Sequence, residues 1–220
     1  MRVLLVEGDG DERAVAVRQL RREGFAVDVR ADLSEAEAAV LEQDYDCVVS
    51  ARDLPDGDSL KLVERWRADG NDVPVMFIDG DAPLEERLAG LAVADDYLAE
   101  PYQVSELVAR VRVLCRRRTW LLPVIERYGD LEVNRSTREV WRAGLRCDLT
   151  PKEFAILEVL VERAGGVVSV SELVERCWDD RADLFTRAVY VHVASLRRKL
   201  GEPPLVRTVR GEGYALRRRA

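Results

Sequence analysis

The first 118 residues alternate between short apolar runs and amphipathic stretches, and this alternation restricts the folds that the chain can adopt. Apolar runs occur at RVLLV, FAVDV, DCVVS, VPVMFI and DYLAE, and a stretch with helical spacing follows each of them. Strands that alternate with helices in this way form a parallel sheet with helices on both faces. The sequence therefore predicts a doubly wound α/β domain, whose ligand crevice lies at the carboxyl ends of the strands.

The remainder of the chain has a different pattern. Residues 119–128 are charged and interrupted by proline, which indicates a linker. Short alternating runs follow, then three helical stretches (LTPKEFAILEVLVERAGG, SVSELVERCW and RAVYVHVASLRRKL) and a hairpin with glycines at its turn (LVRTVRGEGYALR). Thr150 is the expected N-cap of the first of these helices. This order predicts an α+β winged helix-turn-helix, whose third helix can enter a major groove. We therefore expect domains at 1–118 and 129–220.

Charge is distributed unevenly along the chain. The net charge is −7, but residues 1–118 carry 26 acidic against 16 basic residues, whereas residues 119–220 carry 15 acidic against 18 basic. From Arg187 to the end, nine basic residues stand against two acidic ones. A basic end on an acidic protein indicates a nucleic-acid surface, with a solvated charged tail as the simpler alternative.

Composition disfavours several classes of protein. No apolar run approaches the ~20 residues of a membrane span, and the apolar start of the chain is too short for a signal peptide. The cysteines are scattered without a CxxC pair and His192 is the single histidine, so we expect no metal site, no disulfide framework and no cofactor. Without a P-loop or a nucleophile motif, an enzyme is also disfavoured. A cytoplasmic protein is expected.

Several motifs give the chain a resemblance to a known family. The stretches LTPKEF, VHVASLRRKL and RTVRGEGY, together with the altered motifs VEGD, DLPDGDS, ADDYL and EPY, are similar to response regulators of the OmpR/PhoB type. The resemblance spans nearly all 220 residues. It implies a flavodoxin-like (βα)5 receiver domain followed by a winged-helix DNA-binding domain. The implied function is sequence-specific regulation of transcription on double-stranded promoter DNA, with RNA polymerase as a further partner.

The resemblance also locates a phosphorylation site whose chemistry is altered here. A typical receiver has an acidic pair that binds magnesium, an aspartate that accepts phosphate, a Thr or Ser, and a Lys that meets the phosphoryl oxygens. The matching positions hold, in that order, Glu7 and Gly8, Ala51, Asp79, and Glu100. Two carboxylates are therefore lost and two negative charges are gained. Repulsion of about 1–4 kcal/mol per charge pair would oppose a phosphoryl group, so we expect activity that is independent of aspartyl phosphorylation.

Nearby acidic residues leave other interpretations open. Asp53 lies two positions beyond Ala51, so a displaced acceptor would sit roughly 6–7 Å further along the chain. A second interpretation is a cation site, an enzyme's acid cluster or a solvated acidic rim formed by Glu7, Asp9, Asp53, Asp79 and Glu100. A small ligand bound to the altered receiver is a third. An architectural DNA-binding protein with weak sequence preference is a further alternative.

In the family, receivers pair through helix four, strand five and helix five by means of ion pairs. Charged residues match that interface in this sequence, namely Arg87, Asp96, Glu106, Arg110 and Arg112. Arg87 is complementary to Glu106, and Asp96 is complementary to Arg110, so we expect a homodimer through this face. Exposed ion pairs are individually weak and act mainly by setting the register of an interface.

The third helix of the second domain and the hairpin after it supply the expected DNA contacts. Apolar residues with helical spacing should face the core, namely Val189, Val193, Leu196 and Leu200. The expected contact residues are Arg187, Tyr190, His192, Ser195, Arg197 and Arg198 on the helix, and Thr208 and Arg210 on the hairpin. Tyr190 stands where the family usually has a small polar residue, so the base preference should differ. We expect His192 to be packed or to contact phosphate rather than to act as a pH switch.

Overall fold

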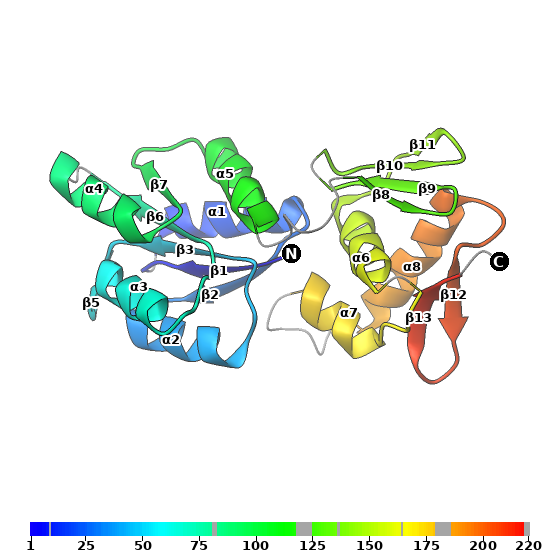
Figure 1. Cartoon of the computed structure of the whole chain (residues 1–220), viewed down its shortest axis with the longest axis horizontal. Helices are drawn as coiled ribbons and strands as arrows, with labels where there is room; N and C mark the ends of the chain where they lie inside the picture. The colour runs from blue at the N-terminus through cyan, green and yellow to red at the C-terminus, as the bar shows by residue number, and fades with distance from the viewer. Residues whose placement is uncertain are drawn as a thin grey trace. The chain divides into compact units, whose positions relative to one another are not determined.

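The computed structural model describes residues 1–8, 10–80, 83–117, 125–135, 137–163, 165–178 and 186–217. The chain divides into two compact units, Met1–Thr119 and Trp120–Ala220 (Figure 1). Of the predicted linker, residues 119–124 lie outside the described residues. The assignment of residues 125–128 to the linker was wrong, because they pair with the next strand along the chain and form β8 (Ile125–Tyr128).

The first unit is built on a parallel sheet with the strand order β2-β1-β3-β6-β7. Its strands are β1 (Arg2–Val6), β2 (Ala26–Arg30), β3 (Cys47–Ala51), β6 (Val75–Asp79) and β7 (Asp96–Ala99). Its helices are α1 (Asp11–Arg22), α2 (Leu33–Glu42), α3 (Ser59–Ala68), α4 (Leu84–Val93) and α5 (Val104–Arg117). A short hairpin of β4 (Asp53–Leu54) and β5 (Gly57–Asp58) lies between β3 and α3. The predicted doubly wound, flavodoxin-like fold is confirmed.

This sheet is buried on both faces. Successive strand residues point to opposite faces, so Leu4 of β1 belongs to the core beneath α2 and α3, whereas Leu5 belongs to the core beneath α1 and α5. Figure 1 shows these helix pairs on opposite sides of the sheet. Strands covered on both faces need apolar residues at nearly every position, which explains the continuous apolar runs in the sequence.

The second unit combines an antiparallel sheet of order β11-β10-β9-β8 with helices and a C-terminal hairpin. After β8 come β9 (Leu131–Asn134), β10 (Glu139–Arg142) and β11 (Leu145–Cys147). The described helices are α6 (Pro151–Glu162), α7 (Val170–Cys177) and α8 (Thr186–Leu200). The hairpin of β12 (Val206–Val209) and β13 (Gly213–Leu216) is called the wing below. The predicted winged helix-turn-helix is confirmed.

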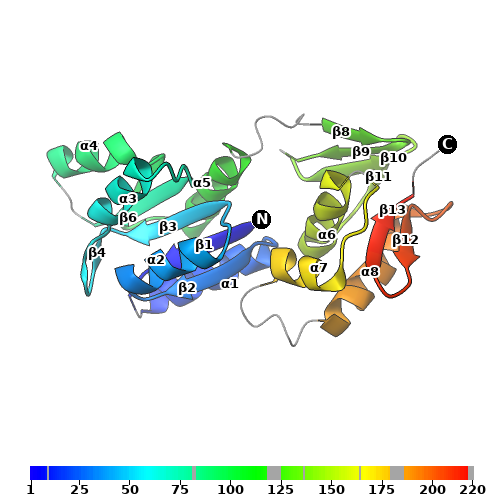
Figure 2. The same cartoon turned by 60° about the horizontal axis from the view of Figure 1, so that its bottom comes forward.

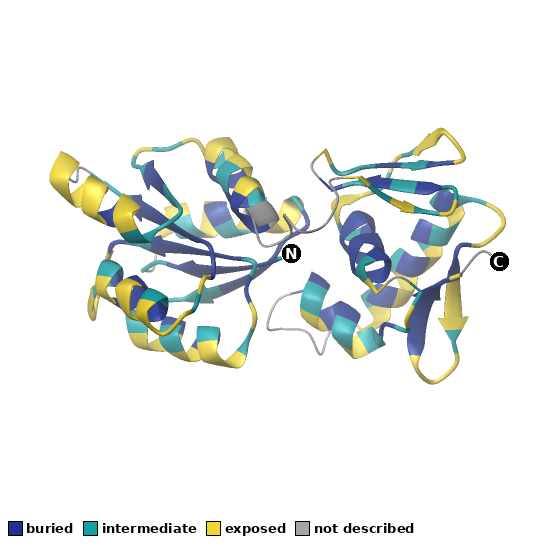
Figure 3. Cartoon of the chain, viewed as in Figure 1, coloured by how far each residue is buried: buried dark blue, intermediate teal, exposed yellow. Residues whose placement is uncertain are grey.

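Helix α6 begins at the predicted cap and is almost entirely buried (Figure 3). The Thr150 amide donates to Glu153 Oε2 at 2.7 Å, and the Lys199 ammonium of α8 donates to the same oxygen at 2.8 Å. Burial opposes ionisation, but the hydrogen bonds from Lys199 and Thr150 lower the pKa of Glu153 to about 2. One carboxylate therefore caps α6 and joins it to α8. Although α6 is apolar, no described helix has both the length and the apolar character to cross a membrane.

The wing is fixed to the loop between α6 and α7. Val168 and Tyr214 exchange two backbone hydrogen bonds, at 2.8 and 2.9 Å. Gly213 precedes this bridge with φ +148°, and a Cβ atom there would lie 2.0 Å from the carbonyl oxygen of Val168. Only glycine allows the two backbones to approach so closely.

Gly213→Ala should lower the free energy of unfolding by more than about 2 kcal/mol, because backbone strain of about 1–3 kcal/mol is added to a steric overlap. Gly211→Ala is the matched control, since Gly211 also has a positive φ (+78°) but open space around its Cβ position. Gly211→Ala should lower the free energy of unfolding by only about 1–2 kcal/mol. Urea denaturation of the full chain measures both, and equal midpoints for the two variants would contradict the close approach.

Candidate functional site

The carboxyl ends of β1, β3, β6 and β7 meet at one edge of the sheet, as parallel strands require. Glu7 follows β1 and Glu100 follows β7, so the sheet brings together residues that are far apart in the sequence. We call this group the strand-end pocket, and it consists of Glu7, Gly8, Ala51, Asp79 and Glu100. Asp9, which the sequence groups with them, lies outside the described residues.

Strand β3 offers no carboxylate to the strand-end pocket, because it ends at Ala51. The Ala51 carbonyl oxygen accepts hydrogen bonds from the hydroxyls of Ser59 and Ser50, at 2.7 and 2.9 Å. Asp53, the candidate displaced acceptor, is exposed on the β4–β5 hairpin, opposite Asp58 in the register. Its side chain therefore faces solvent rather than the partly buried end of β3.

Three carboxylates converge on the β1 side of the pocket. Glu7, Glu100 and Glu12 of α1 each place one oxygen within 4.8 Å of the others. Burial and then repulsion from Glu100 and Glu12 raise the pKa of Glu7 to about 7, although Arg13 opposes the shift. The Glu7 Oε2 atom is buried and has no hydrogen-bond partner among the described residues. Oxygen ligands of this kind suit a hard cation, whereas they repel a phosphate group.

The Asp79 carboxylate is oriented by a hydrogen bond from β7. The Tyr97 hydroxyl donates to Asp79 Oδ2 at 2.5 Å, and the Tyr97 side chain is buried. Burial and the neighbouring Asp79 carboxylate raise the pKa of Tyr97, which keeps the phenol protonated as a donor. The guanidinium of Arg87 lies 5.6 Å from the centre of the same ring. Asp79 is thus linked through Tyr97 to a residue of the predicted dimer face.

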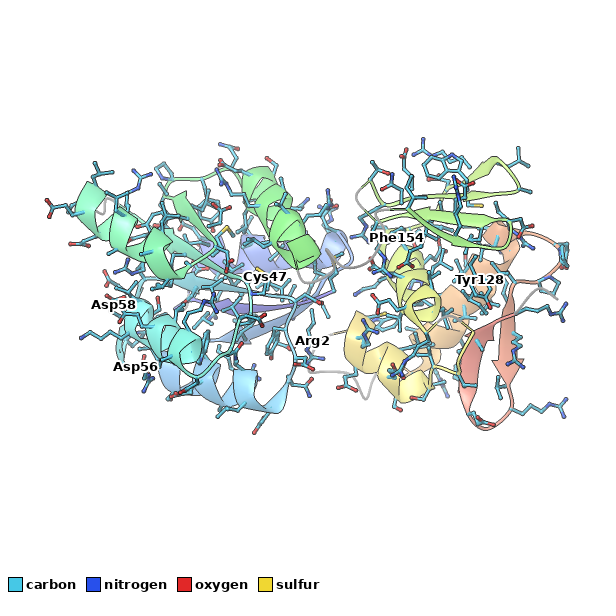
Figure 4. All side chains as sticks on the ribbon, in the orientation of Figure 1. Arg2, Cys47, Asp56, Asp58, Tyr128 and Phe154 are labelled. Atoms are coloured by element: carbon cyan, nitrogen blue, oxygen red, sulfur yellow. The ribbon has the colours of Figure 1, made fainter. Side chains whose placement is uncertain are left out.

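Arg52 is a buried cation beside the pocket that the sequence analysis did not identify. Its guanidinium donates two hydrogen bonds of 3.0 Å to Asp58, a residue labelled in Figure 4. The guanidinium also lies 5.3 Å from the centre of the Phe77 ring. It also packs against Gly90 of α4, where a Cβ atom would lie 3.3 Å from Arg52 Nη1 and 3.2 Å from the Tyr97 ring. The sequence signal was the basic residue directly after Ala51.

A cavity adjoins the three glutamates. It has a volume of about 220 Å³ and is lined by Asp11, Glu12, Val15, Glu100, Pro101, Tyr102 and Val104. The lining thus combines carboxylates with apolar side chains. Burial and nearby carboxylates raise the pKa of Tyr102 to about 12, so its hydroxyl remains neutral. An apolar or cationic group suits this lining better than an anion does.

The predicted dimer residues pair within the chain. Arg110 donates to Asp96 at 3.0 Å and to Glu106 at 2.8 Å, so the complementary pair Asp96/Arg110 is formed on one molecule. Glu106 therefore contacts Arg110 rather than Arg87, and Arg112 donates to Glu23 of α1 at 2.8 Å. Beside these charges, α4 exposes a row of apolar side chains, namely Leu84, Leu88 and Leu91.

Helix α8 places its apolar residues as predicted, since Val189, Val193, Leu196 and Leu200 are all buried. The opposite face is exposed and contains Arg187, Tyr190, Val191, Ala194 and Arg198. Arg210 is exposed at the turn of the wing. Figure 2 shows the wing beside α8. Two arginines of α8, Arg187 and Arg198, and two of the wing, Arg207 and Arg210, are therefore exposed to an external partner.

Arg197 has a different environment from the one expected of a base-reading residue. Its Nε donates to the Val206 carbonyl oxygen at 2.8 Å and its Nη2 donates to Thr208 Oγ1 at 2.7 Å. Its guanidinium also lies 5.6 Å from the centre of the Tyr214 ring. The structure thus joins Arg197 and Thr208, two of the predicted DNA-contacting residues, to each other. Arg197 fastens α8 to the wing.

His192 and Ser195 lie on the side of α8 that turns towards the rest of the unit. The His192 ring packs 5.9 Å from the Trp178 ring, and burial lowers the pKa of His192. The Ser195 hydroxyl accepts a hydrogen bond from Arg198 at 3.2 Å. These contacts agree with the packed environment expected for His192.

Comparison with known proteins identifies both units. Residues 3–112 match the response regulator receiver domain, and residues 144–216 match the C-terminal domain of transcriptional regulatory proteins. The transcriptional regulatory protein CutR of Streptomyces coelicolor is 45% identical, over 98% of this chain and 100% of CutR. TcrA of Mycobacterium tuberculosis is 38% identical, over 99% of this chain and 88% of TcrA. A solved structure described as a streptococcal redox sensor evolved from two-component response regulators is 26% identical, with a TM-score of 0.51 over 99% of each chain.

The raised pKa of Glu7 predicts a pH-dependent stability. Between the ordinary value of 4.5 and about 7, the folded chain keeps a proton that the unfolded chain releases. The free energy of unfolding should therefore fall as pH rises through this window. Glu7→Gln should remove that fall and be more stable than the parent at pH 8, whereas Glu42→Gln, at an exposed end of α2, should retain it. Urea midpoints measured from pH 4 to 8 test this, and parallel curves for Glu7→Gln and the parent would contradict it.

Proposed function

Because the chain belongs to the OmpR/PhoB-type response regulators, in which a receiver domain precedes a DNA-binding domain, we propose that it regulates transcription without phosphorylation of its strand-end pocket. The observation that carries this proposal is Ala51, whose methyl group ends the strand where a typical receiver presents its acceptor aspartate. Glu100 and Asp79 add negative charge where a phosphoryl group would need cations or hydroxyls. Ala51 itself offers no side-chain oxygen to a metal.

In this proposal the receiver acts as a constitutive dimerisation module through α4, β7 and α5. The Asp79–Tyr97 hydrogen bond and the Arg87–Tyr97 contact support it, because they connect the strand-end pocket to β7 and α4 without a phosphoryl group. The apolar row on α4 and the charges of Arg87, Glu106 and Arg112 would then meet a second copy. Ion pairs already formed within each chain, such as Asp96–Arg110, would set the register of the two copies.

The DNA-binding surface proposed here consists of the exposed face of α8 and the wing. Arg187 and Arg198 are exposed on α8 and can reach base edges or phosphates in a major groove, while Arg210 can enter the minor groove. Tyr190 is also exposed on this face, with 53% of its surface accessible. A dimer would place two such surfaces on half-sites about one helical turn apart, upstream of RNA polymerase.

A second candidate mechanism is control by a small ligand in the receiver. The cavity of about 220 Å³ lined by Glu12 and Glu100 is the observation that favours it, because a lining of apolar side chains and carboxylates is suited to a small organic molecule. Occupation of this cavity would bias dimerisation or DNA affinity. Phosphorylation at Asp53 is less favoured, since that side chain is exposed on a hairpin, opposite Asp58 in the register.

Acetyl phosphate with magnesium should leave three properties of the protein unchanged, namely its intact mass, its sedimentation as a dimer and its DNA affinity. The reason is that Ala51 cannot accept phosphate and the surrounding carboxylates repel it. Ala51→Asp alone should also remain unmodified, whereas Gly8→Asp combined with Ala51→Asp, Asp79→Thr and Glu100→Lys restores metal, acceptor and oxygen-binding groups. A phosphoryl adduct on the parent that Asp53→Asn abolishes would show instead that the acceptor has moved.

Selection of bound duplexes from random DNA should yield a defined site, and loss of Arg187 or Arg210 should weaken binding to it. If these arginines contact bases, Arg187→Ala and Arg210→Ala should each weaken the free energy of DNA binding by roughly 1–3 kcal/mol. If they contact phosphate, each substitution should make the DNA affinity less dependent on salt concentration. Arg127→Ala, an exposed arginine of β8, is the control and should bind like the parent. Gel-shift titration measures all three. Parent-like binding by both test variants, or recovery of no preferred sequence, would overturn this surface.

A further inference from the structure

The carboxyl-terminal end of α8 meets an unusual partner. The last carbonyl groups of a helix have no N–H partner within the helix, so they accept hydrogen bonds from other donors. Here α8 ends at Leu200, and Gly201 follows with φ +75° and donates its amide to the Arg197 carbonyl oxygen at 3.0 Å. The Leu200 and Gly201 carbonyl oxygens are left pointing out of the helix end.

Both oxygens accept hydrogen bonds from one arginine of the four-stranded sheet. Arg142, the last residue of β10, donates from Nη1 to Leu200 O and Gly201 O, each at 2.7 Å. Its Nη2 donates to the Pro203 carbonyl oxygen, in the short segment that leads into the wing. Only 6% of its surface is exposed, and Asp130 lies 3.7 Å from its Nε. One buried guanidinium of the sheet therefore contacts the end of α8 and the segment that leads into the wing.

We propose that Arg142 is a positioning residue for DNA recognition, which sets the location of α8 and the wing relative to each other. The inference rests on the proposed DNA-binding surface but involves no contact with DNA, because the guanidinium is buried and bonded to three carbonyl groups. A planar fork with several donors suits these acceptors, and a positive charge is favourable at the negative end of the helix dipole. Lysine supplies the charge but not the fork.

Specific and non-specific binding should depend on Arg142 to different extents. Specific binding requires that α8 reach base edges while the wing reaches the adjacent groove, so it depends on their relative position. Non-specific binding depends on the number of phosphates neutralised by exposed basic groups. Because Arg142 is not one of those groups, its loss should reduce discrimination between DNA sequences rather than overall attraction to DNA.

The experiment compares full-length Arg142→Met and Arg142→Lys with the parent, using fluorescence anisotropy on the selected duplex and on a scrambled duplex of equal length. Arg146→Met is the matched control, since Arg146 lies on the neighbouring strand β11 with its side chain 66% exposed. Titrations are made at several salt concentrations, at a temperature where circular dichroism shows each variant to be folded. Arg142→Met should lose roughly 5- to 100-fold in affinity for the selected duplex, the range that one mismatched base pair costs.

For Arg142→Met, the affinity for the scrambled duplex and the salt dependence of binding should stay at the parent's values. The affinity of Arg142→Lys for the selected duplex should lie between those of the parent and Arg142→Met. The control should match the parent on both duplexes. Folded Arg142 variants that bind both duplexes like the parent, or that lose affinity equally on both, would overturn the positioning role. If Arg142→Met does not fold, the same comparison on Arg142→Lys decides. A parent that fails to distinguish the duplexes would overturn the proposed function first, and the positioning role with it.

Discussion

Parallel strands bring their carboxyl ends to one edge of a sheet, and in the first unit this geometry gathers negative charge that no lysine balances. Glu7, Glu12 and Glu100 converge there within 4.8 Å. The structure manages the charge in two ways. Burial and repulsion raise the pKa of Glu7 to about 7, so that it keeps its proton to a higher pH, and Asp79 accepts a hydrogen bond from the Tyr97 hydroxyl. The remaining contacts of the pocket follow from these two responses, because Tyr97 then lies under α4 and beside Arg87.

The fold could be predicted from local patterns because its elements are individually well marked. Apolar runs of strand length, the Thr150 cap and the spacing of Val189, Val193 and Leu196 depend on periods of two and 3.6 residues that are read directly from a sequence. The start of the second unit was less visible. The strand over 125–128 is short and its residues are partly exposed, so only pairing with β9 distinguishes it from a linker.

The site was predictable in position but not in its contacts. The resemblance placed Ala51, Asp79 and Glu100 near one another, and the sheet register brings the ends of their strands to one edge. The roles of individual arginines were not predictable, because a long flexible side chain can reach partners on several elements. Arg197 turns towards Val206 and Thr208 instead of outwards, and the buried Arg52 pairs with the partly exposed Asp58. Glu12 joins the acidic group only because α1 begins beside the ends of β1 and β7.

Helix α4 is attached to the first unit in an unusual way, since Gly90 is its one buried residue among the described positions 84–93. Its three leucines are exposed, and Figure 3 shows most of the helix as exposed. At Gly90 the helix lies close to the Tyr97 ring and the Arg52 guanidinium. Little buried apolar area becomes exposed to solvent when such a helix unfolds locally. Its local unfolding should therefore require far less free energy than unfolding of the sheet. Amide protons of α4 would then exchange with solvent while β1 and β3 remain protected. The helix can reshape itself against a partner at low energetic cost, and the sheet that carries it stays intact.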